Sequence, residues 1–259
     1  MRSNDVMNDF QGRCVLITGG DGGVGAAVGA QFAARGATVV LAGIRPSQGA
    51  ALAAQIGPRV EYLELDVSRE AHWVRAVGEV VARHGRLDVL VNNAGYLRAG
   101  LSIEDTTLEE WQRHFAVNSD GTFLGCKHAI LAMKQTGGGA IVNVSSAVAT
   151  RLHWQSPAYG VSKAAILATT RVAALHCNHK AYGIRVNAVL PGPVDTEMMR
   201  SNVGSAAEFE QMSKFLRDKY ALARIGVPDD IAQIVVFLAS SQASYVTGAA
   251  FTVDGGQSA

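Results

Sequence analysis

Short apolar runs recur along the chain, and longer stretches with the spacing of helices lie between them. The runs occupy residues 14–18, 38–42, 60–65, 87–92, 140–144, 184–190 and 249–253, and the clearest helical stretches occupy residues 23–35, 69–84, 108–134, 157–180 and 229–239. Strands that are apolar on both faces are typical of a parallel sheet that helices cover on both sides. The pattern therefore predicts an α/β fold, a doubly wound Rossmann-type parallel sheet of seven strands with helices on both faces.

One segment departs from this alternation. From residue 191 to about residue 220 no strand pattern is present, and large apolar side chains stand among polar ones: Met198, Met199, Phe209, Met212 and Phe215. We expect this segment to be helical and mobile, a lid over a binding site.

Elsewhere no change of composition marks a boundary, and α/β folds of 259 residues often form one unit. We therefore expect a single domain over residues 1–259.

Composition and charge exclude several classes of protein. The chain is 48 % apolar and 17 % charged with a formal net charge of +1, and its Lys and Arg residues are scattered, so no nucleic-acid partner is expected. No run of about 18 apolar residues is present, so we expect no membrane span. Cys14, Cys126 and Cys177 are odd in number and fit no metal spacing. They indicate a reduced, cytoplasmic protein without a metal site, and residues 1–10 lack the apolar core of a secretion signal.

The turn after the first strand has the chemistry of a phosphate-binding loop. Residues 18–25 read TGGDGGVG and lead from the first strand into the first helix. Glycines allow positive φ and remove side chains that would keep a pyrophosphate from the backbone. The N-terminus of the helix then offers free N–H groups and the positive end of its dipole. This placement predicts a dinucleotide site, with a ligand-free glycine turn as the alternative.

Further motifs follow the later strands in a fixed order. Asp66-Val67 follows the third strand, residues 92–95 (NNAG) follow the fourth, Asn118 lies within the next helical stretch, Ser145-Ser146 ends the fifth strand, and Pro191-Gly192 ends the sixth. With the glycine spacing Gly-x-x-x-Gly-x-Gly, these motifs resemble the short-chain dehydrogenase/reductase family, in its compact single-domain branch. The resemblance covers nearly the whole chain, and residues 132–138 and 184–187 look similar to bacterial hydroxysteroid and cyclic-alcohol dehydrogenases.

The resemblance implies an NAD(P)(H)-dependent oxidoreductase, and Tyr159 and Lys163 carry the chemistry that such a reaction needs. Hydride transfer to a carbonyl requires a proton for the developing alkoxide. A phenol supplies one if its pKa of about 10 is lowered by a nearby cation and a helix N-terminus. Tyr159 and Lys163 are four residues apart on one helix face, and Ser156-Pro157 resembles an N-cap followed by Pro in the first turn.

The other members of the reacting group come partly from spacing and partly from the resemblance. Ser146 lies thirteen residues before Tyr159, as in the family, and its hydroxyl could support charge on the substrate oxygen. Ser145 is the alternative, on the other face of the strand. By resemblance, Lys163 also binds the nicotinamide ribose, and Asn118 holds a water that connects Lys163 to solvent. A purely structural role in a kinked helix is the alternative for Asn118. The expected catalytic residues are Asn118, Ser146, Tyr159 and Lys163.

The expected cofactor residues all follow strand ends. By resemblance, Asp66 holds the adenine amino group. The full set is Gly19, Asp21, Gly22, Gly23, Val24, Gly25, Gly43, Arg45, Asp66, Val67, Asn93, Ala94, Gly95, Tyr159, Lys163, Pro191, Gly192, Val194 and Thr196.

The choice between NAD and NADP is normally made at the end of the second strand, where an acidic residue accepts the 2′-hydroxyl of NAD. Gly43 stands at that position, and Arg45 could meet a 2′-phosphate. Against NADP, Gly22 stands where members of the family that use NADP carry a basic residue. Asp21 would repel a phosphate and could replace the missing acceptor. We expect NAD or NADP, with the balance towards NAD.

The residues expected around the substrate are mostly large and apolar. The set comprises Tyr96, Val148, His153, Trp154, Met198 and Met199, with Leu97, Ala147, Leu152 and Val194 as further candidates. They favour an apolar secondary alcohol and ketone, cyclic or aryl-substituted. The alternatives are a 3-oxoacyl thioester reductase, for which we find no basic docking patch, and a dinucleotide-binding sensor without turnover.

Assembly is expected to follow the family. The stretches at 108–134 and 157–180 carry apolar residues on more than one face, which favours burial against a second copy. The resemblance implies a homotetramer, with a monomer as the alternative.

Overall fold

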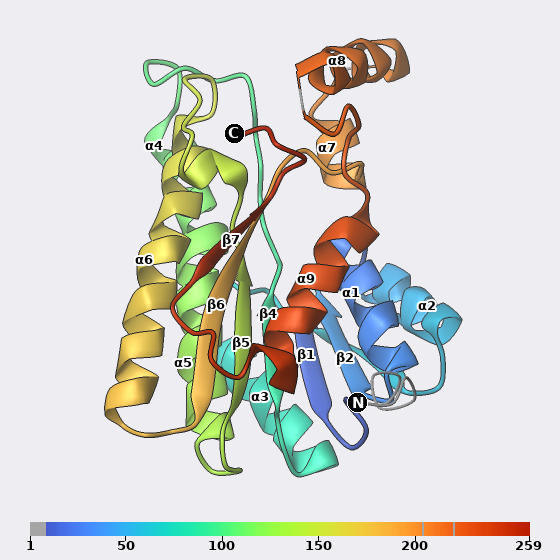
Figure 1. The fold of residues 1–259 in the computed structure, drawn as a ribbon, viewed down its shortest axis with the longest axis vertical. Helices are drawn as coiled ribbons and strands as arrows, with labels where there is room; N and C mark the ends of the chain where they lie inside the picture. The colour runs from blue at the N-terminus through green and yellow to red at the C-terminus, as the bar shows by residue number, and fades with distance from the viewer. Residues whose placement is uncertain (1–8, 204, 220) are drawn as a thin grey trace.

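The computed structural model describes residues 9–203, 205–219 and 221–259, and its centre is a parallel β-sheet (Figure 1). Within these residues the sheet has seven strands in the order β3-β2-β1-β4-β5-β6-β7. Their bounds are β1 Cys14–Thr18, β2 Thr38–Gly43, β3 Val60–Glu64, β4 Val89–Asn92, β5 Gly139–Val144, β6 Ile184–Pro191 and β7 Ala250–Val253. The doubly wound Rossmann-type fold is thus confirmed.

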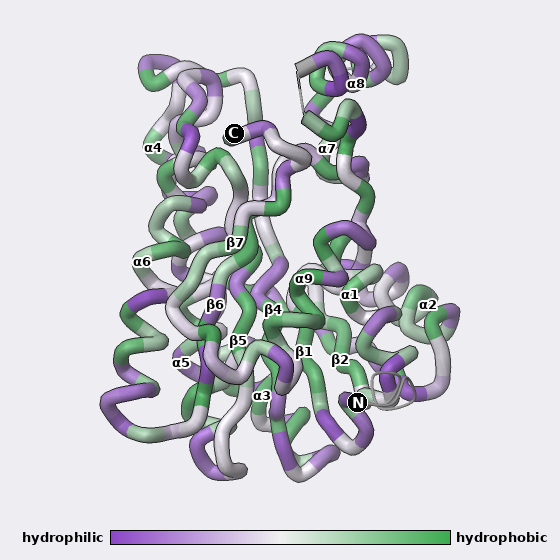
Figure 2. Tube along the Cα trace, viewed as in Figure 1, coloured by the Kyte–Doolittle hydropathy of each residue, from purple (hydrophilic) through white to green (hydrophobic). Residues whose placement is uncertain are grey.

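Helices cover both faces of the sheet. On one face lie α1 (Gly23–Ala34), α2 (Pro46–Ile56) and α9 (Pro228–Ala239), and on the other lie α3 (Glu70–His84), α5 (Gly121–Met133) and α6 (Pro157–His179). Side chains alternate along each strand. Val15 and Ile17 of β1 therefore enter the core under α1 and α9, whereas Cys14 and Leu16 enter the opposite core. Burial on both sides explains the continuous apolar runs, and Figure 2 shows them as green strands at the centre.

The predicted helix at residues 108–134 is interrupted. It begins as α4 (Leu108–His114), passes through a π-helical segment (Phe115–Asp120) and continues as α5. A π-helical segment forms i→i+5 hydrogen bonds, which span one residue more than those of an α-helix, and it is frequent at functional sites. Asn118 lies within this segment.

Within its described residues, the segment after β6 contains two helices and no strand, as expected from its pattern. These are α7 (Glu197–Ser201) and α8 (Ala206–Lys219), which stand beyond the carboxyl ends of the strands at the top of Figure 1. Residues 204 and 220 of the expected lid, and residues 1–8 of the N-terminal lead-in, lie outside the described residues.

The strand order places a crevice next to β1. From β1 the chain winds outward through β2 and β3, then returns to β4 on the other side of β1. At such a switch of direction the loops after the two neighbouring strands diverge, and ligands bind in the gap outside their carboxyl ends. The glycine turn after β1 and the NNAG segment after β4 flank this gap.

Candidate active site

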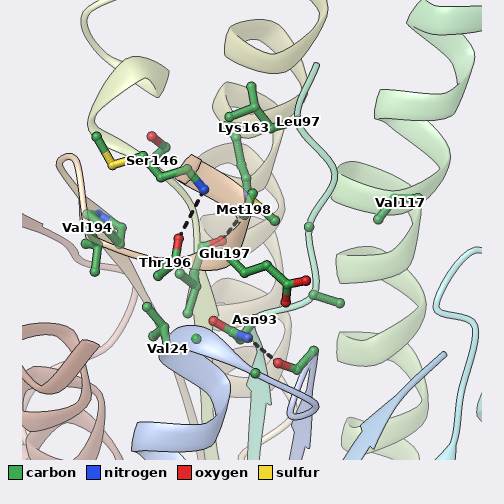
Figure 3. A pocket seen from close by; sticks show the side chains of 18 of the residues that line it. Val24, Asn93, Leu97, Val117, Ser146, Lys163, Val194, Thr196, Glu197 and Met198 are labelled. Atoms are coloured by element: carbon green, nitrogen blue, oxygen red, sulfur yellow. Dashed lines mark hydrogen bonds between the residues drawn. The ribbon is translucent and has the colours of Figure 1, made fainter. Parts of the chain in front are cut away.

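A cavity of about 560 Å³ opens beyond the carboxyl ends of the strands, within the usual range for small-molecule sites (Figure 3). Of the nineteen residues expected to bind the cofactor, eighteen line it, and Gly25 does not. In Figure 3, Val24 and Asn93 project from the β1 and β4 side, while Thr196, Glu197 and Met198 approach from the start of α7.

The glycine turn has the backbone of an anion cradle. Gly19 (φ +62°) and Gly23 (φ +52°) adopt left-handed conformations, and Gly22 is the N-cap of α1. A Cβ on Gly22 would meet only the ends of the Arg45 and Gln48 side chains within 4 Å. The space above the helix N-terminus is therefore open to a ligand, and the turn fits a dinucleotide pyrophosphate.

Gly25 and Asn93 shape this turn from behind. A Cβ on Gly25 would lie 2.2 Å from the Gly19 carbonyl oxygen. The Asn93 amide donates to the carbonyl oxygens of Thr18 (3.0 Å) and Gly19 (3.1 Å), and the Thr18 hydroxyl accepts from the backbone N–H groups of Asn93 and Ala94 (both 3.0 Å). These contacts fix the glycine turn against the loop after β4.

Asp66 and Val67 are the residues expected at the adenine end of a dinucleotide. Both line the cavity, and Asp66 Oδ1 accepts from the backbone N–H (3.0 Å) and hydroxyl (2.6 Å) of Ser68. Asp66 Oδ2 pairs with Arg69 at 3.3 Å. The carboxylate is thus oriented by its own loop.

The N-terminal turns of α6 carry Tyr159 and Lys163. Pro157 occupies the first turn as expected, but the Ser156 side chain makes no capping hydrogen bond, so its expected N-cap role is confined to its backbone carbonyl, which accepts from Gly160 N at 2.9 Å. Lys163 Nζ lies 5.8 Å from the centre of the Tyr159 ring and donates to the Val144 carbonyl oxygen at 3.0 Å.

Ser146 and Ser145 at the end of β5 point in different directions, as expected for neighbours on an extended segment. The Ser146 side chain hydrogen-bonds to Tyr159. The Ser145 hydroxyl donates to the Lys163 carbonyl oxygen at 2.7 Å and so anchors α6 to the sheet. Ser146, and not Ser145, is therefore the serine that hydrogen-bonds to the Tyr159 phenol.

Burial dominates the electrostatics of this group. Lys163 is only 4 % exposed, and burial lowers its pKa from 10.5 to about 8. Burial raises the pKa of Tyr159, while the hydrogen bond from Ser146 lowers it. The expectation that a nearby cation holds the Tyr159 pKa below its usual value is not met by the protein alone, because desolvation outweighs the stabilisation of the phenolate.

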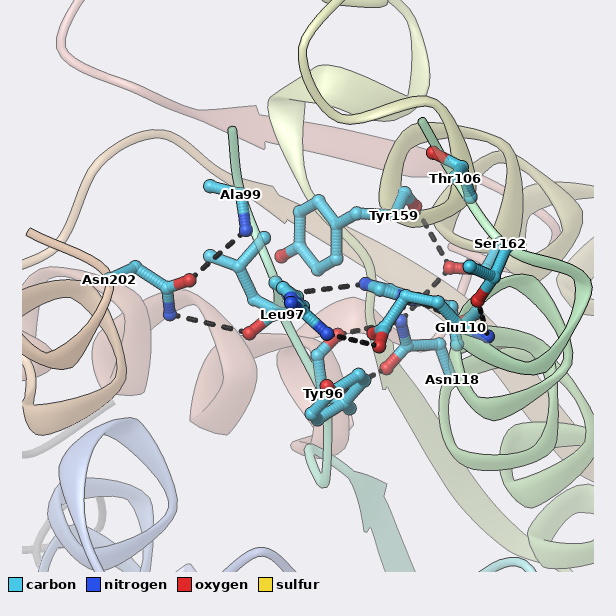
Figure 4. A network of polar contacts seen from close by, with 12 residues as sticks. Tyr96, Leu97, Ala99, Thr106, Glu110, Asn118, Tyr159, Ser162 and Asn202 are labelled. Atoms are coloured by element: carbon cyan, nitrogen blue, oxygen red, sulfur yellow. Dashed lines mark hydrogen bonds and ion pairs between the residues drawn. The ribbon is translucent and has the colours of Figure 1, made fainter. Parts of the chain in front are cut away.

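Asn118 is fully buried and joins the loop after β4 to α6 (Figure 4). Its Oδ1 accepts from Tyr96 N at 2.8 Å, and its Nδ2 donates to the Tyr96 carbonyl oxygen at 3.0 Å and to Ser162 Oγ at 2.9 Å. Asn118 does not line the cavity. A Cβ on Gly95 would lie 3.3 Å from Lys163 Nζ and 3.5 Å from Asn118 Oδ1, so both groups border the space beside Gly95.

The residues expected to contact substrate separate into two groups. Val148, Met198 and Met199 line the cavity, as do Leu97 and Ala147 from the wider candidate set. Tyr96, His153 and Trp154 do not. Tyr96 packs against His114 and Arg113, while Trp154 is 70 % exposed and stacks on His153.

Polar contacts hold α7 across the cavity from two sides. Glu197 pairs with Arg45 at 2.9 Å, on the β2 side. Asn202 Oδ1 accepts from Ala99 N at 3.1 Å, and its Nδ2 donates to the Leu97 carbonyl oxygen at 3.3 Å, on the β4 side (Figure 4). Sequence reasoning missed Glu197, although its place after Thr196, which caps α7, was a signal. It also missed Gln257, which lines the cavity from the C-terminal segment without any local signal.

Two negative findings concern the described part of the chain. No helix there combines the length and apolarity that a bilayer-spanning segment needs. Residues 9–203, 205–219 and 221–259 contain no group of three or more His, Cys, Asp or Glu side chains placed to hold a metal ion.

Comparisons with known proteins agree with this geometry. Residues 19–258 match the family model described as enoyl-(acyl carrier protein) reductase. The chain is 39 % identical over 250 residues to a 3-beta-hydroxysteroid dehydrogenase of Comamonas testosteroni, with 95 % of this chain and 96 % of that protein covered.

Two further relatives act on other alcohols by name. An NADP-dependent (R)-specific alcohol dehydrogenase of Lentilactobacillus kefiri is 38 % identical over 253 residues, with 96 % of this chain and 98 % of that protein covered. A 2,5-dichloro-2,5-cyclohexadiene-1,4-diol dehydrogenase of Sphingobium indicum is 36 % identical over 254 residues, with the same coverage of 96 % and 98 %. With the fold, the cavity and the Ser146–Tyr159–Lys163 group in place, the chain belongs to the short-chain dehydrogenase/reductase family.

Proposed function

We propose that this chain interconverts an apolar secondary alcohol, cyclic or aryl-substituted, and its ketone, with NAD(P)(H) as the redox partner and Tyr159 as the acid and base. The observation that carries the proposal is the hydrogen bond between the side chains of Tyr159 and Ser146, which lies at the end of β5. Both residues line the cavity that also contains the glycine turn. A proton donor and a dinucleotide cradle in one cavity are what reversible carbonyl reduction requires.

Ser146 and Tyr159 have different roles at the substrate oxygen. When bound, NAD(P)(H) would supply or accept the hydride. In the reductive direction Ser146 donates a hydrogen bond to the carbonyl oxygen, and Tyr159 gives its proton to the oxygen as negative charge develops. In the oxidative direction the Tyr159 phenolate takes the alcohol proton. Burial raises the pKa of the Tyr159 phenol, so positive charge beside the phenol favours the phenolate that the oxidative step needs.

Lys163 and Asn118 support the Tyr159 phenol without contacting the substrate oxygen. The Lys163 ammonium is the cation within reach of Tyr159, and we assign it the nicotinamide ribose hydroxyls as well. Lys163 Nζ and Asn118 Oδ1 both border the space beside Gly95. A water there would connect the ammonium to the Asn118 side chain, which supports a proton path through Asn118.

The cavity wall supports an apolar substrate. Leu97, Val148, Val194, Met198 and Met199 line it, and methionine side chains adapt to irregular apolar ligands. The named relatives include a hydroxysteroid dehydrogenase and a cyclic diol dehydrogenase, which favours a ring-bearing alcohol. A role of Tyr96, His153 or Trp154 in substrate binding would require the loops that carry them to move inward.

We extend the proposal to the organisation of the chain. Residues 1–259 form one NAD(P)-binding domain, and residues of about 191–220 act as its lid, which in the closed form is held by Glu197 and Asn202.

Exposed apolar side chains on α5 and α6, among them Phe123 (55 %), Val172 (66 %) and Leu175 (69 %), support a homotetramer. Three unpaired, buried cysteines fit a cytoplasmic location. Light scattering of the purified chain tests the assembly.

The decisive experiment replaces the phenol hydroxyl alone. Tyr159→Phe should lower kcat for ketone reduction by about a hundredfold or more, since general acid catalysis contributes on that scale. NADH or NADPH binding, followed by nicotinamide fluorescence, should change by less than about threefold, which is under 1 kcal/mol. Tyr245→Phe is the matched control, because Tyr245 is fully exposed. Undiminished turnover by Tyr159→Phe would remove Tyr159 from the chemistry.

A substrate panel tests the rest of the proposal. Cyclic and aryl ketones should be reduced with higher kcat/KM than 3-oxoacyl thioesters. Activity confined to thioesters would assign the alternative function instead.

A further inference from the structure

The end of β2 lacks the side chain that usually selects NAD. In dinucleotide-binding α/β folds an acidic residue there accepts the ribose 2′-hydroxyl of NAD. Here the residue is Gly43, which is buried at the last position of β2 and lines the cavity. A Cβ on Gly43 would lie 2.8 Å from both Cγ and Oδ2 of Asp21 and 3.0 Å from Asp21 Oδ1. The Asp21 carboxylate therefore occupies the place into which a side chain at residue 43 would project.

Asp21 is held in this place by neighbours from the segment after β2. Arg45 Nε donates to Asp21 Oδ2 at 3.1 Å, and Arg45 Nη2 donates to the Asp21 carbonyl oxygen at 3.3 Å. Gln48 Nε2 donates to the same carbonyl oxygen at 3.0 Å. Asp21 is only 7 % exposed, yet it lines the cavity, and no residue in the described part of the chain donates a hydrogen bond to its Oδ1. One carboxylate oxygen is thus left to accept from a ligand.

Arg45 is occupied on its other side as well. Its Nη1 donates to Glu197 Oε2 at 2.9 Å, so its three nitrogens contact Asp21 and Glu197. These hydrogen bonds raise the pKa of Arg45, which stays charged. The group of Asp21, Arg45 and Glu197 carries two negative charges and one positive charge. The group therefore has a net charge of −1 beside Gly43.

We propose that Asp21, from the glycine turn, replaces the missing acidic residue of β2 as acceptor for the adenosine ribose hydroxyls, and that Arg45, held between Asp21 and Glu197, makes the site select NAD over NADP. The inference rests on the proposed function, because it concerns the nucleotide of that same cavity. A ribose diol donates to Asp21 Oδ1 without disturbing the group. A 2′-phosphate would meet the Asp21 carboxylate, unless Arg45 left both acidic partners to contact it.

The test uses two probes that contain only the adenosine half of the cofactors and undergo no redox step: ADP-ribose and 2′-phospho-ADP-ribose. Titration calorimetry on the wild-type chain should give ADP-ribose about tenfold or more tighter binding, the factor expected of a charged hydrogen bond. Asp21→Asn should weaken ADP-ribose binding by about tenfold and strengthen binding of the 2′-phospho probe. Asp105→Asn, an exposed aspartate outside the cavity lining, should change neither.

Moving the carboxylate to β2 provides a rescue. Gly43→Asp alone should lose ADP-ribose binding, since its side chain would meet the Asp21 carboxylate at about 2.8 Å. The double variant Asp21→Ser with Gly43→Asp places the acid at the usual position and should regain the wild-type ratio of the two affinities to within about threefold. The double variant also decides the matter if Asp21→Asn fails to fold.

The outcomes distinguish failure of the proposed function from failure of the inference about Asp21 and Arg45. If neither probe binds the wild-type chain, the proposed function fails together with the inference. If both bind but the 2′-phospho probe binds more tightly, or Asp21→Asn leaves the ratio unchanged, the inference fails and the oxidoreductase assignment stands. An unrescued double variant likewise rules out exchange between positions 21 and 43.

Discussion

Lys163 allows a test of whether a charged side chain buried in the active site lowers the stability of the fold. Its ammonium is 4 % exposed, and burial lowers its pKa from 10.5 to about 8. A charged group with a lowered cationic pKa destabilises the folded state as long as it remains protonated. We predict that Lys163→Met, which keeps the length of the side chain and removes the charge, stabilises the nucleotide-free protein at pH 7.

The magnitude follows from the pKa. Since each pKa unit corresponds to about 1.36 kcal/mol, keeping Lys163 charged in the fold costs roughly 3 kcal/mol at pH 7. The substitution also removes the hydrogen bond from Nζ to the Val144 carbonyl oxygen, a loss of about 1–2 kcal/mol. The variant should therefore gain about 1–2 kcal/mol in unfolding free energy at pH 7.

The pH dependence distinguishes this explanation from simple repacking. Below pH 8 the folded and unfolded chains both carry the lysine proton, whereas between pH 8 and 10.5 only the unfolded chain keeps it. Stability of the wild type should then rise relative to the variant by roughly 3 kcal/mol across that window, so that the wild type becomes the more stable protein near pH 10.5. Other titrating groups are common to both proteins and cancel in the difference.

Urea unfolding at pH 7, 8, 9 and 10.5 measures the effect, with exposed Lys180→Met as the control. Parallel stability curves for wild type and Lys163→Met over this range would refute the reasoning, since they would show that Lys163 does not titrate between 8 and 10.5 in the fold.

Two further substitutions test contacts that support the site. Gly25→Ala would bring a Cβ to 2.2 Å from the Gly19 carbonyl oxygen, so we expect a loss of about 1–3 kcal/mol in unfolding free energy and at least about tenfold weaker ADP-ribose binding, measured by urea unfolding and calorimetry. Arg185 donates to carbonyl oxygens at the end of α9, including those of Leu238 (2.6 Å) and Ser240 (2.9 Å). Arg185→Ala should cost about 2–4 kcal/mol in unfolding free energy, because these acceptors lose a charged donor, with little change in KM.

Each of these has its own control. Gly78→Ala on α3 meets no atom within 4 Å and should be neutral or stabilising by about 0.5–1 kcal/mol, so equal losses at Gly25 and Gly78 would contradict a steric cause. For Arg185, a Lys substitution keeps the charge but supplies fewer donors. Full stability of Arg185→Ala would mean that water replaces the guanidinium at the end of α9.

Much of the fold was predictable because its signals are local. A strand buried on both faces is apolar at nearly every position, and β1, fully buried from Cys14 to Thr18 and apolar up to Ile17, could be recognised without any partner. The glycine turn was recognisable because residues 18–25 alone carry its backbone requirements. Tyr159 and Lys163 share a helix face by their spacing, whatever surrounds them.

Features that depend on residues far apart in sequence required the tertiary structure. The sequence showed that Gly43 removes an acidic side chain and that Asp21 could replace it, but only the structure places the Asp21 carboxylate in that space and engages Arg45 with Glu197, 152 residues away.

The same holds for the electrostatics of the site. The sequence predicted that Lys163 lowers the pKa of Tyr159 from their spacing, yet burial by the surrounding chain raises it. The sequence by itself determined the succession of strands and helices along the chain, because periodicity is a local property, and its motifs, through the family they resemble, indicated the reacting groups. Only the tertiary structure decided the charge balance around those groups, because desolvation and ion pairing depend on every element that packs against them.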